Sequence, residues 1–384
     1  MVKNQHFIPR CVLKWFKESD DVLNKRQKRM YHVLHNRKDI FQTTTEKAMS
    51  RDYYYEIQDL KENKIEEMLS GFEVYFSAKL GKLIYLLEEY ETGKLKLKEV
   101  KLSIYDILQD MVRMHLRSGA LVYELGYWEG TDRKRKSIHR MLDRFLNSIY
   151  IYQFCSTLID HYEICIMKSC DKNFIVSDQY LCTASLSFKA QFGNSTNRTI
   201  GLKDVIVLIP ISKKYYLCFY NGKKPHYIKS NQFVSLKQNE VEEINRVIIN
   251  NSYMETAGSA RKVLADAVSE YQIISPRSVQ FGGGKFVGGS EMRKEVFFYR
   301  EDYEIFKYVS DPSNWSNDRL VTKNEVCPCG SGIIYKDCCR YKARAFAKFY
   351  EILEQQDKDP KYNPWIIPNC TFHEKNISDY YTRL

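Results

Sequence analysis

The sequence lacks the features of several large protein classes. It has no apolar run of about eighteen residues, and its first residues lack the basic-then-apolar order of a secretory signal. Only 9 prolines and 17 glycines occur among 384 residues, which excludes a collagen-like chain. It also has no G-x-S-x-G elbow, kinase set, dinucleotide-binding set or H-E-x-x-H spacing. We therefore expect a cytoplasmic protein with no membrane partner and no catalytic zinc.

Positive charge and cysteine are the two abundant features. With 59 Lys and Arg against 48 Asp and Glu, the net charge is +11, which favours anionic partners such as nucleic acid or the ribosome. Four of the 11 cysteines gather near the end of the chain, and the others are scattered, most of them among apolar neighbours. Scattered thiols of this kind are typical of a reduced cytoplasmic protein with one metal site.

Apolar residues recur at helical spacing through the first half of the chain. The pattern predicts helices over residues 63–87, 103–127 and 138–162, after a short helix from Ile8 and a strand near residues 30–34. After residue 162, compact runs at 163–167, 174–176, 205–209 and 215–220 predict an antiparallel sheet, and a helical pattern returns over 239–271. The predicted fold class is α+β, helix-rich in its N-terminal half, with a small zinc-bound C-terminal module.

Four segments follow from these patterns. Residues 1–275 form the main α+β domain, and residues 276–320 form a polar, glycine-rich connector that is either a flexible linker or a hairpin. Residues 321–345 form the cysteine-bearing module, and residues 346–384 form a basic helix and tail. The glycine-rich stretch does not follow the order of a phosphate-binding loop.

Two closely spaced cysteine pairs give the most specific motif in the chain. Cys327 and Cys329 are separated from Cys338 and Cys339 by a Gly-Ser-Gly turn and Tyr335. Four thiolates suit a closed tetrahedral zinc site, and a site with four protein ligands has no open position for catalysis. The zinc is therefore predicted to be structural.

These residues resemble the SEC-C motif, C-x-C-G-S-G-x-x-Y-x-x-C-[CH], a zinc module found at the end of the bacterial preprotein translocase motor and of many other bacterial proteins. The resemblance implies that the module offers a basic surface, including Lys336 and Arg340, to protein or nucleic acid. The alternative is a structural staple without a partner.

The N-terminus carries the pattern Q-H-x-x-P-x-x-x-L-x-x-F from Gln5 to Phe16. This opening resembles a bacterial family known only as domain of unknown function 4238. The resemblance implies a helix with an arginine, a strand that ends in Ser-Asp, and a later helix with an asparagine. Arg113 or Arg117, the Ser-Asp that ends at Asp178, and Asn245 are the matching residues.

His6, Arg113, Arg117 and Asp178 are the candidate catalytic residues. A histidine near neutral pKa can move a proton, two arginines four apart on a helix can clamp a phosphate, and a carboxylate can orient a histidine. These are the groups that phosphodiester cleavage requires. For each, a structural role is the alternative: a hydrogen bond for His6, pairing with Asp110 for the arginines, and a turn cap for Asp178.

A second set of basic residues is expected to contact nucleic acid, and it includes a basic run that usually forms a solvated loop. The set comprises Arg10, Arg133, Lys134, Arg135, Lys136, Lys336 and Arg340.

Two functions remain open from the sequence. The first is a nucleic-acid-directed or nucleotide-directed effector of the defence or toxin type, a candidate phosphodiester hydrolase whose zinc module recruits a target. The second is a non-enzymatic adaptor that binds RNA, ribosome or protein. The sequence leaves the oligomeric state open.

Overall fold

The computed structural model describes most of the chain up to Arg344. The described ranges are residues 3–18, 29–36, 39–126, 132–187, 203–272, 277–281, 289–294, 296–310, 322–327 and 331–344. Cys329 and the predicted C-terminal helix and tail beyond Arg344 lie outside these ranges. Among the described helices, none combines the length and apolar character needed to cross a bilayer.

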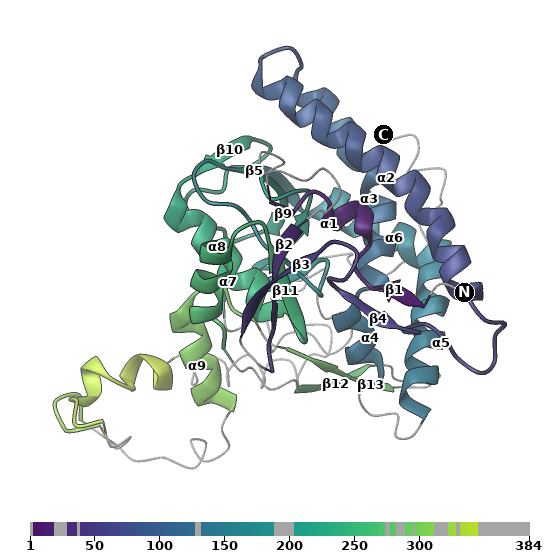
Figure 1. Ribbon diagram of the computed structural model, residues 1–384. Helices are drawn as coiled ribbons and strands as arrows, with labels where there is room; N and C mark the ends of the chain where they lie inside the picture. Colours follow the sequence, from purple (N-terminus) through teal and green to yellow (C-terminus); the bar gives the residue numbers. More distant parts are fainter. Residues whose placement is uncertain are drawn as a thin grey trace.

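Long amphipathic helices dominate the first half, as the apolar spacing predicts (Figure 1). The helices are α1 (Arg10–Leu13), α2 (Lys64–Glu91), α3 (Leu97–Leu116), α4 (Gly119–Gly126), α5 (Arg133–Leu146), α6 (Ser148–His161), α7 (Gln238–Asn251), α8 (Arg261–Ser269) and α9 (Arg300–Ser310). On α2 and α3, buried residues recur every three or four positions and join one hydrophobic core. The α+β fold class is confirmed.

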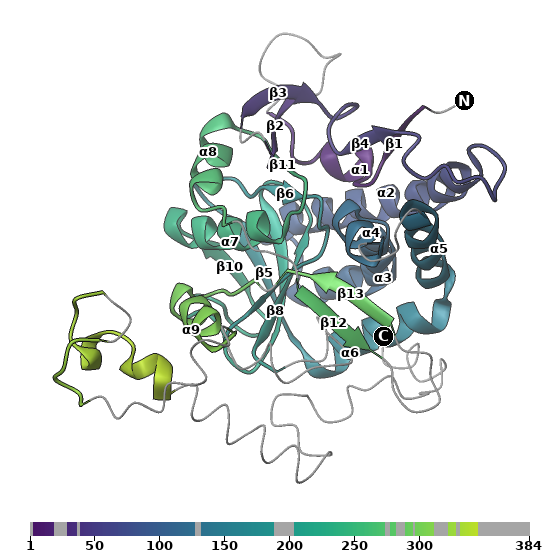
Figure 2. The ribbon, with the colours of Figure 1, turned by 90° about the horizontal axis from the view of Figure 1, so that it is seen from below.

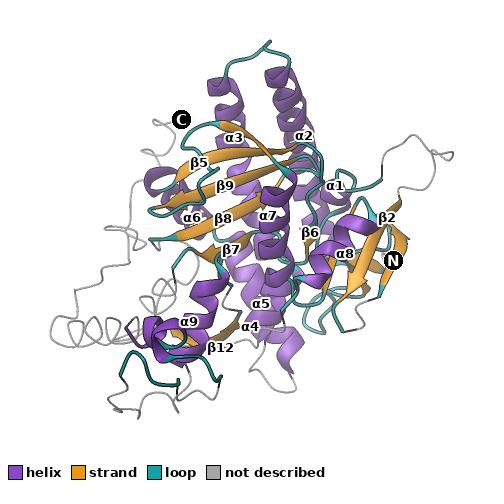
Figure 3. Cartoon of the chain, turned by 90° about the vertical axis from the view of Figure 1, so that its left-hand side faces the viewer, coloured by secondary structure: helices purple, strands orange, loops and turns teal. Residues whose placement is uncertain are grey.

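A five-stranded sheet forms the centre of the domain, in the order β10-β5-β9-β8-β7. Its strands are β5 (Glu163–Ser169), β7 (Cys182–Ser185), β8 (Val205–Pro210), β9 (Tyr215–Asn221) and β10 (Phe233–Leu236). All neighbours are antiparallel except β10 and β5, which run parallel. Figure 3 shows α7 on one face of this sheet and α3 and α6 on the other. Every residue of β8 is buried, because both faces are covered.

A second, four-stranded sheet brings distant segments together in the order β3-β2-β11-β6. Its strands are β2 (Arg29–Leu34), β3 (Ile40–Thr44), β6 (Val176–Ser177) and β11 (Glu255–Gly258). Two strand pairs stand apart from both sheets, β1 (Asn4–His6) with β4 (Ser50–Asp52), and β12 (Arg277–Phe281) with β13 (Gly289–Arg293). Strand β11 is the junction, because it joins the N-terminal β2 to β6.

Four predicted boundaries differ from the structure. The helices predicted over 103–127 and 138–162 are each interrupted, the first around Ser118 and the second at Asn147, which caps α6. The helix predicted over 239–271 is wrong in its middle, where β11 pairs with β2 and β6. The basic run predicted as a loop is helical, because Arg133 to Lys136 form the first turn of α5.

The predicted connector of residues 276–320 contains regular structure. The hairpin alternative is confirmed, since β12 and β13 pair antiparallel across the glycine-rich stretch. Beyond it, Phe298 is buried in the main core and Phe297 bridges to Ser185 at the edge of the five-stranded sheet. In the view from below, β12, β13 and α9 lie beside the main domain (Figure 2). The described part of this connector therefore packs on the main domain.

Candidate functional site

The C-terminal module gathers three of its four cysteines. The sulfur atoms of Cys327, Cys338 and Cys339 all lie within 4.8 Å of one another. Two local features hold this arrangement: an isolated bridge between Val326 and Ile334, and a 3-10 turn over Tyr335–Asp337. The turn directs the adjacent pair Cys338 and Cys339 back toward Cys327.

These three thiols fit a tetrahedral metal. With a Zn–S bond of about 2.3 Å, tetrahedral geometry places the sulfurs about 3.8 Å apart. The sulfurs of Cys338 and Cys339 are separated by 3.8 Å. In the described part of the module, Cys327 and Cys339 are buried whereas the apolar Val326 and Ile333 are exposed, which suits cysteines turned toward a shared centre. Cys329 lies outside the described residues, so its place as fourth ligand stays a prediction.

His6 and Arg117 meet, but through the main chain of His6. The Arg117 guanidinium, at the end of α3, contacts the His6 carbonyl and the carboxylate of Glu73, and is fully buried. The hydroxyl of Tyr55 donates to the Arg117 carbonyl at 3.1 Å. Arg117 thus ties β1 to α2 and α3, and contact with a phosphate would require this network to open.

The imidazole of His6 is buried beside a carbonyl group. Its Nε2 lies 3.2 Å from the oxygen of Thr45, to which it donates. Burial lowers the pKa of His6 to about 4, so the ring is neutral near pH 7. The pairing of β1 with β4 places His6 opposite Ser50. The bond from the His6 ring to Thr45 is therefore a second contact that holds β1 in place.

Arg113 lies one helical turn before Arg117. Its guanidinium is 3.5 Å from Asp110 and stacks over the ring of Phe72 at 5.3 Å. This is the pairing that the structural alternative expects. The two arginines therefore do not form one clamp in this structure.

Asp178 lies at the end of β6 and is fully buried. Its carboxylate accepts from the Ser252 hydroxyl at 2.7 Å and from the backbone N–H groups of Tyr253 at 3.0 Å and Met254 at 2.7 Å. Burial raises the pKa of Asp178 to about 6 in spite of these donors. Asp178 thus caps the turn that leads into β11, while its raised pKa also suits proton transfer.

The four candidate catalytic residues occupy three separate environments. His6 and Arg117 form one cluster, Arg113 pairs within α3, and Asp178 caps the turn before β11. No contact joins the His6 ring to the Asp178 carboxylate among the described residues. Their catalytic roles stay predictions.

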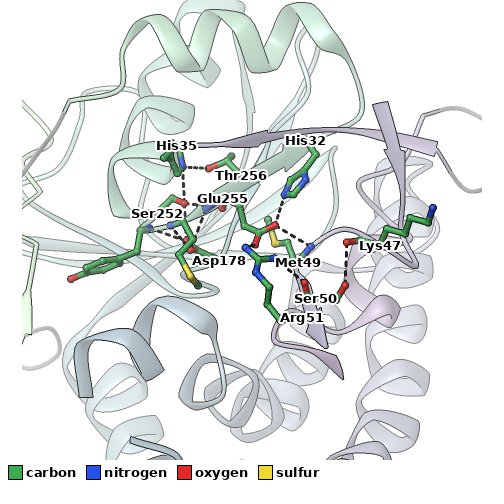
Figure 4. Close-up of polar contacts among 12 residues, drawn as sticks. His32, His35, Lys47, Met49, Ser50, Arg51, Asp178, Ser252, Glu255 and Thr256 are labelled. Atoms are coloured by element: carbon green, nitrogen blue, oxygen red, sulfur yellow. Dashed lines mark hydrogen bonds and ion pairs between the residues drawn. The ribbon is translucent and has the colours of Figure 1, made fainter. Parts of the chain in front are cut away.

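Beside Asp178 lies an ionic cluster that the sequence reading missed. Glu255, the first residue of β11, is fully buried and contacts His32 of β2 and Arg51 of β4, the latter at 2.6 Å (Figure 4). The backbone N–H of Met49 also donates to Glu255 at 3.3 Å. A buried carboxylate is stable only when it is paired in this way, so the three strands meet around one charge.

A second histidine lies on the Asp178 side of the cluster. The Nε2 of His35 is 2.8 Å from the hydroxyl of Ser252 and 3.1 Å from that of Thr256 (Figure 4). Burial lowers the pKa of His35 to about 3. His35, Ser252 and Asp178 therefore form a continuous hydrogen-bonded chain.

Arg51 connects this buried cluster to the surface. Its side chain is 43% exposed, whereas that of Glu255 is fully buried. It lines a shallow recess with Asn4, Lys47, Ser50 and Asp52. Arg51 forms an ion pair with Glu255 and donates to the Ser50 carbonyl at 2.8 Å, which leaves part of its five-donor guanidinium facing the recess.

The predicted nucleic-acid-binding residues of the main domain lie near this recess or on α5. Lys134 donates to the Tyr53 carbonyl at 2.8 Å, next to β4, and Arg135 pairs with Asp59. Arg10 pairs with Glu46 at 3.0 Å, and Arg133 lies over the ring of Tyr123. Lys136 is exposed on the first turn of α5, and Lys336 and Arg340 lie in the module. Their contacts with nucleic acid stay predictions.

Little in the sequence singled out the Glu255 cluster. Glu255 falls inside an apparently continuous helical pattern, and His32 and Arg51 occur in short segments with no recognisable spacing. Only the pairing of β11 with β2 brings them together. A histidine within a predicted strand was the one available signal.

The fold and these sites define an α+β domain with a cysteine cluster of metal-binding type near its C-terminus. A model of the family described as "Protein of unknown function (DUF4238)" matches residues 4–262, and the SEC-C motif matches residues 324–340. The chain belongs to the DUF4238 family and carries a SEC-C motif. Neither the comparison with curated proteins nor that with solved structures found a match.

Proposed function

We propose that this protein is a nucleic-acid-directed or nucleotide-directed effector of the defence or toxin type, a phosphodiester hydrolase acting in the cytoplasm. The observation that carries the proposal is the ion pair between buried Glu255 and half-exposed Arg51, which holds a guanidinium at the edge of a surface recess. A guanidinium fixed from behind binds a phosphate without losing side-chain freedom.

The cluster also supplies groups for proton transfer. Asp178, with its pKa raised to about 6, and the chain from Ser252 to His35 lie on the other side of the turn before β11. Hydrolysis of a phosphodiester needs a group to move a proton and a cation to stabilise the developing charge. Arg51 would supply the cation, and Asp178 or His6 would move the proton once the site admits substrate.

We further propose that the module binds one structural zinc ion through Cys327, Cys329, Cys338 and Cys339. The spacing of the described sulfurs supports this ligand set. The zinc would supply folding energy to the module, whose basic residues Lys336 and Arg340 would then recruit a nucleic acid, ribosome or protein target.

The test is a turnover assay with total RNA, plasmid DNA and nucleotides, with and without chelator. The proteins are wild type, His6→Ala, Asp178→Asn, Arg51→Ala and a matched control, Lys94→Ala. Lys94 lies just after α2, and its replacement removes an exposed ion pair with Glu89. We expect cleavage by wild type and Lys94→Ala and loss of cleavage in Arg51→Ala. Equal turnover by Arg51→Ala would overturn the assignment of the recess.

A non-enzymatic adaptor is the second candidate. It is favoured by the separation of His6, Arg113 and Asp178 and by the full burial of Arg117. An adaptor would bind RNA with steep salt dependence and form no product from any of these substrates.

A further inference from the structure

A cavity of about 520 Å³ lies between α7, α8 and α9, remote in sequence from the Arg51 recess. Figure 1 shows these three helices together on the side of the domain away from α2 and α5. The volume falls within the range of about 300–1,000 Å³ that is usual for small-molecule sites. Its lining is mainly charged and polar, so its ligand is expected to be polar.

Arg246 of α7 is a partly buried cation in the lining of this cavity. Its guanidinium donates to the Phe298 carbonyl at 2.5 Å, and no carboxylate lies within ion-pair distance of it among the described residues. Burial, with the nearby positive charge of Arg300, lowers the pKa of Arg246. A partly buried cation beside a second cation is stabilised by an anion that reaches both.

Two other cations of the lining, Lys172 and Arg300, are already paired with carboxylates of the protein. Lys172 is 7% exposed and bridges Glu242 at 2.7 Å and Asp266 at 2.6 Å. Arg300, at the start of α9, pairs with Glu270. The cavity therefore has a guanidinium edge, where Arg300 is paired with Glu270 and Arg246 has no ion-pair partner among the described residues, and a carboxylate edge that is anchored by Lys172.

We propose that this cavity binds a nucleotide-sized phosphate ester. Arg246 and Arg300 would hold the phosphate, because guanidinium groups match phosphate oxygens in a bidentate manner. Glu242 and Asp266 would accept hydrogen bonds from the sugar hydroxyls, as carboxylates do for ribose in other nucleotide sites. Lys172 would keep these two carboxylates in place.

This site is independent of the proposed hydrolase activity. It uses none of the residues assigned to the recess or to the Asp178 turn, and it lies on other elements. Helix α7 also carries Asn245, whose side chain accepts from the N–H of Ile175 just before β6. A ligand at Arg246 would thus contact the helix that supports the strand leading to Asp178.

The experiment is calorimetric titration of the full chain with AMP as the probe, and with ribose 5-phosphate, adenosine and inorganic phosphate as comparison ligands. We expect AMP and ribose 5-phosphate to bind and adenosine to bind at least about tenfold more weakly, because it lacks the charged group. Binding of adenosine as tight as that of AMP would overturn the role of the arginines. Inorganic phosphate as tight as AMP would overturn the nucleotide-sized ligand.

Variants test the residues themselves. Arg246→Gln is expected to weaken AMP binding about tenfold or more. Arg300→Ala is a second variant, and because Arg300 lies at the exposed rim this variant should fold even if Arg246→Gln does not. Arg261→Ala is the matched control, since Arg261 is exposed on α8 outside the cavity lining. No binding of AMP and ribose 5-phosphate by wild type at millimolar concentration, or unchanged binding by both cavity variants, would overturn the proposal.

Discussion

The main domain and the C-terminal module are stabilised by different means. The main domain buries long apolar faces of α2, α3 and β8 in one core and places a few charges inside it. In the described part of the module, Val326 and Ile333 are at least half exposed, and the buried residues are Cys327 and Cys339. A segment this short cannot bury enough apolar surface, so we expect a metal to replace the core.

The comparison also shows what each region reveals in sequence. The module can be recognised in the sequence by its cysteine spacing, because the four ligands of a structural zinc site must reach one ion. The ionic cluster of the main domain leaves no such mark, because its members come from three strands far apart in the chain.

The largest expected effect is loss of the metal from the module. Replacing both Cys338 and Cys339 by Ser should abolish zinc binding and unfold the module, because two ligands are removed at once. Metal analysis of denatured wild type should find about one zinc per chain. The main domain should still melt cooperatively at the wild-type temperature, and joint loss of both transitions would show that the two regions are not separately stabilised.

The next effect concerns Glu255 in the core. Glu255→Gln should destabilise the main domain by about 3 kcal/mol, because it leaves His32 and Arg51 without their buried carboxylate. Chemical denaturation would measure the free energy of unfolding. Asp59→Asn is the control, since it removes exposed pairs with Arg135 and His139 and should cost much less than Glu255→Gln. An equal loss of unfolding free energy in the two variants would show that the burial of the Glu255 ion pairs adds nothing to stability.

A pH effect on stability is expected from His6. Its pKa is about 4 when folded and about 6.5 in an unfolded chain, so the unfolded state binds the proton first as the pH falls. The contribution of His6 to stability is present above pH 6.5 and is lost as the pH falls toward 4, with an upper limit of about 3 kcal/mol. The difference between wild type and His6→Gln across this range isolates it, and a difference independent of pH would contradict the burial of the ring.

The smallest effect is expected on the surface of the module. Lys336→Ala and Arg340→Ala should each weaken RNA binding uniformly across sequences and reduce the slope of log K against log salt by about 1. Zinc content should be unchanged, because neither residue is a ligand. An unchanged salt slope in both variants would leave the module as a staple without a nucleic-acid partner.

Periodicity predicted the long helices and several strands because burial of one face repeats locally. It failed where packing between distant segments decided the structure. Helices α3 and α4 are separated around Ser118, and there Gly119 lies against Phe7 and Met254, where a Cβ atom would come within 2.8 Å of both side chains. Strand β11 interrupts a helical pattern because β2 and β6 pair with it on both sides.

The candidate site was predictable only in part. The cysteine spacing located three thiols that the structure brings together in an arrangement that could hold a metal ion. His6, Arg117 and Asp178 are fully or largely buried in polar networks, but sequence could not show that Arg117 would turn to the His6 carbonyl and Asp178 to a turn 75 residues later. Their chemistry depends on neighbours that only the fold supplies.

The most direct test of the Arg51 recess as a nucleic-acid-binding site is a titration of labelled single-stranded RNA with the full chain at several salt concentrations. The account predicts binding by wild type that weakens steeply with salt, and at least about tenfold weaker binding by Arg51→Ala with zinc content and a cooperative unfolding transition retained. Binding by Arg51→Ala equal to that of wild type, or no binding by either protein, would contradict it.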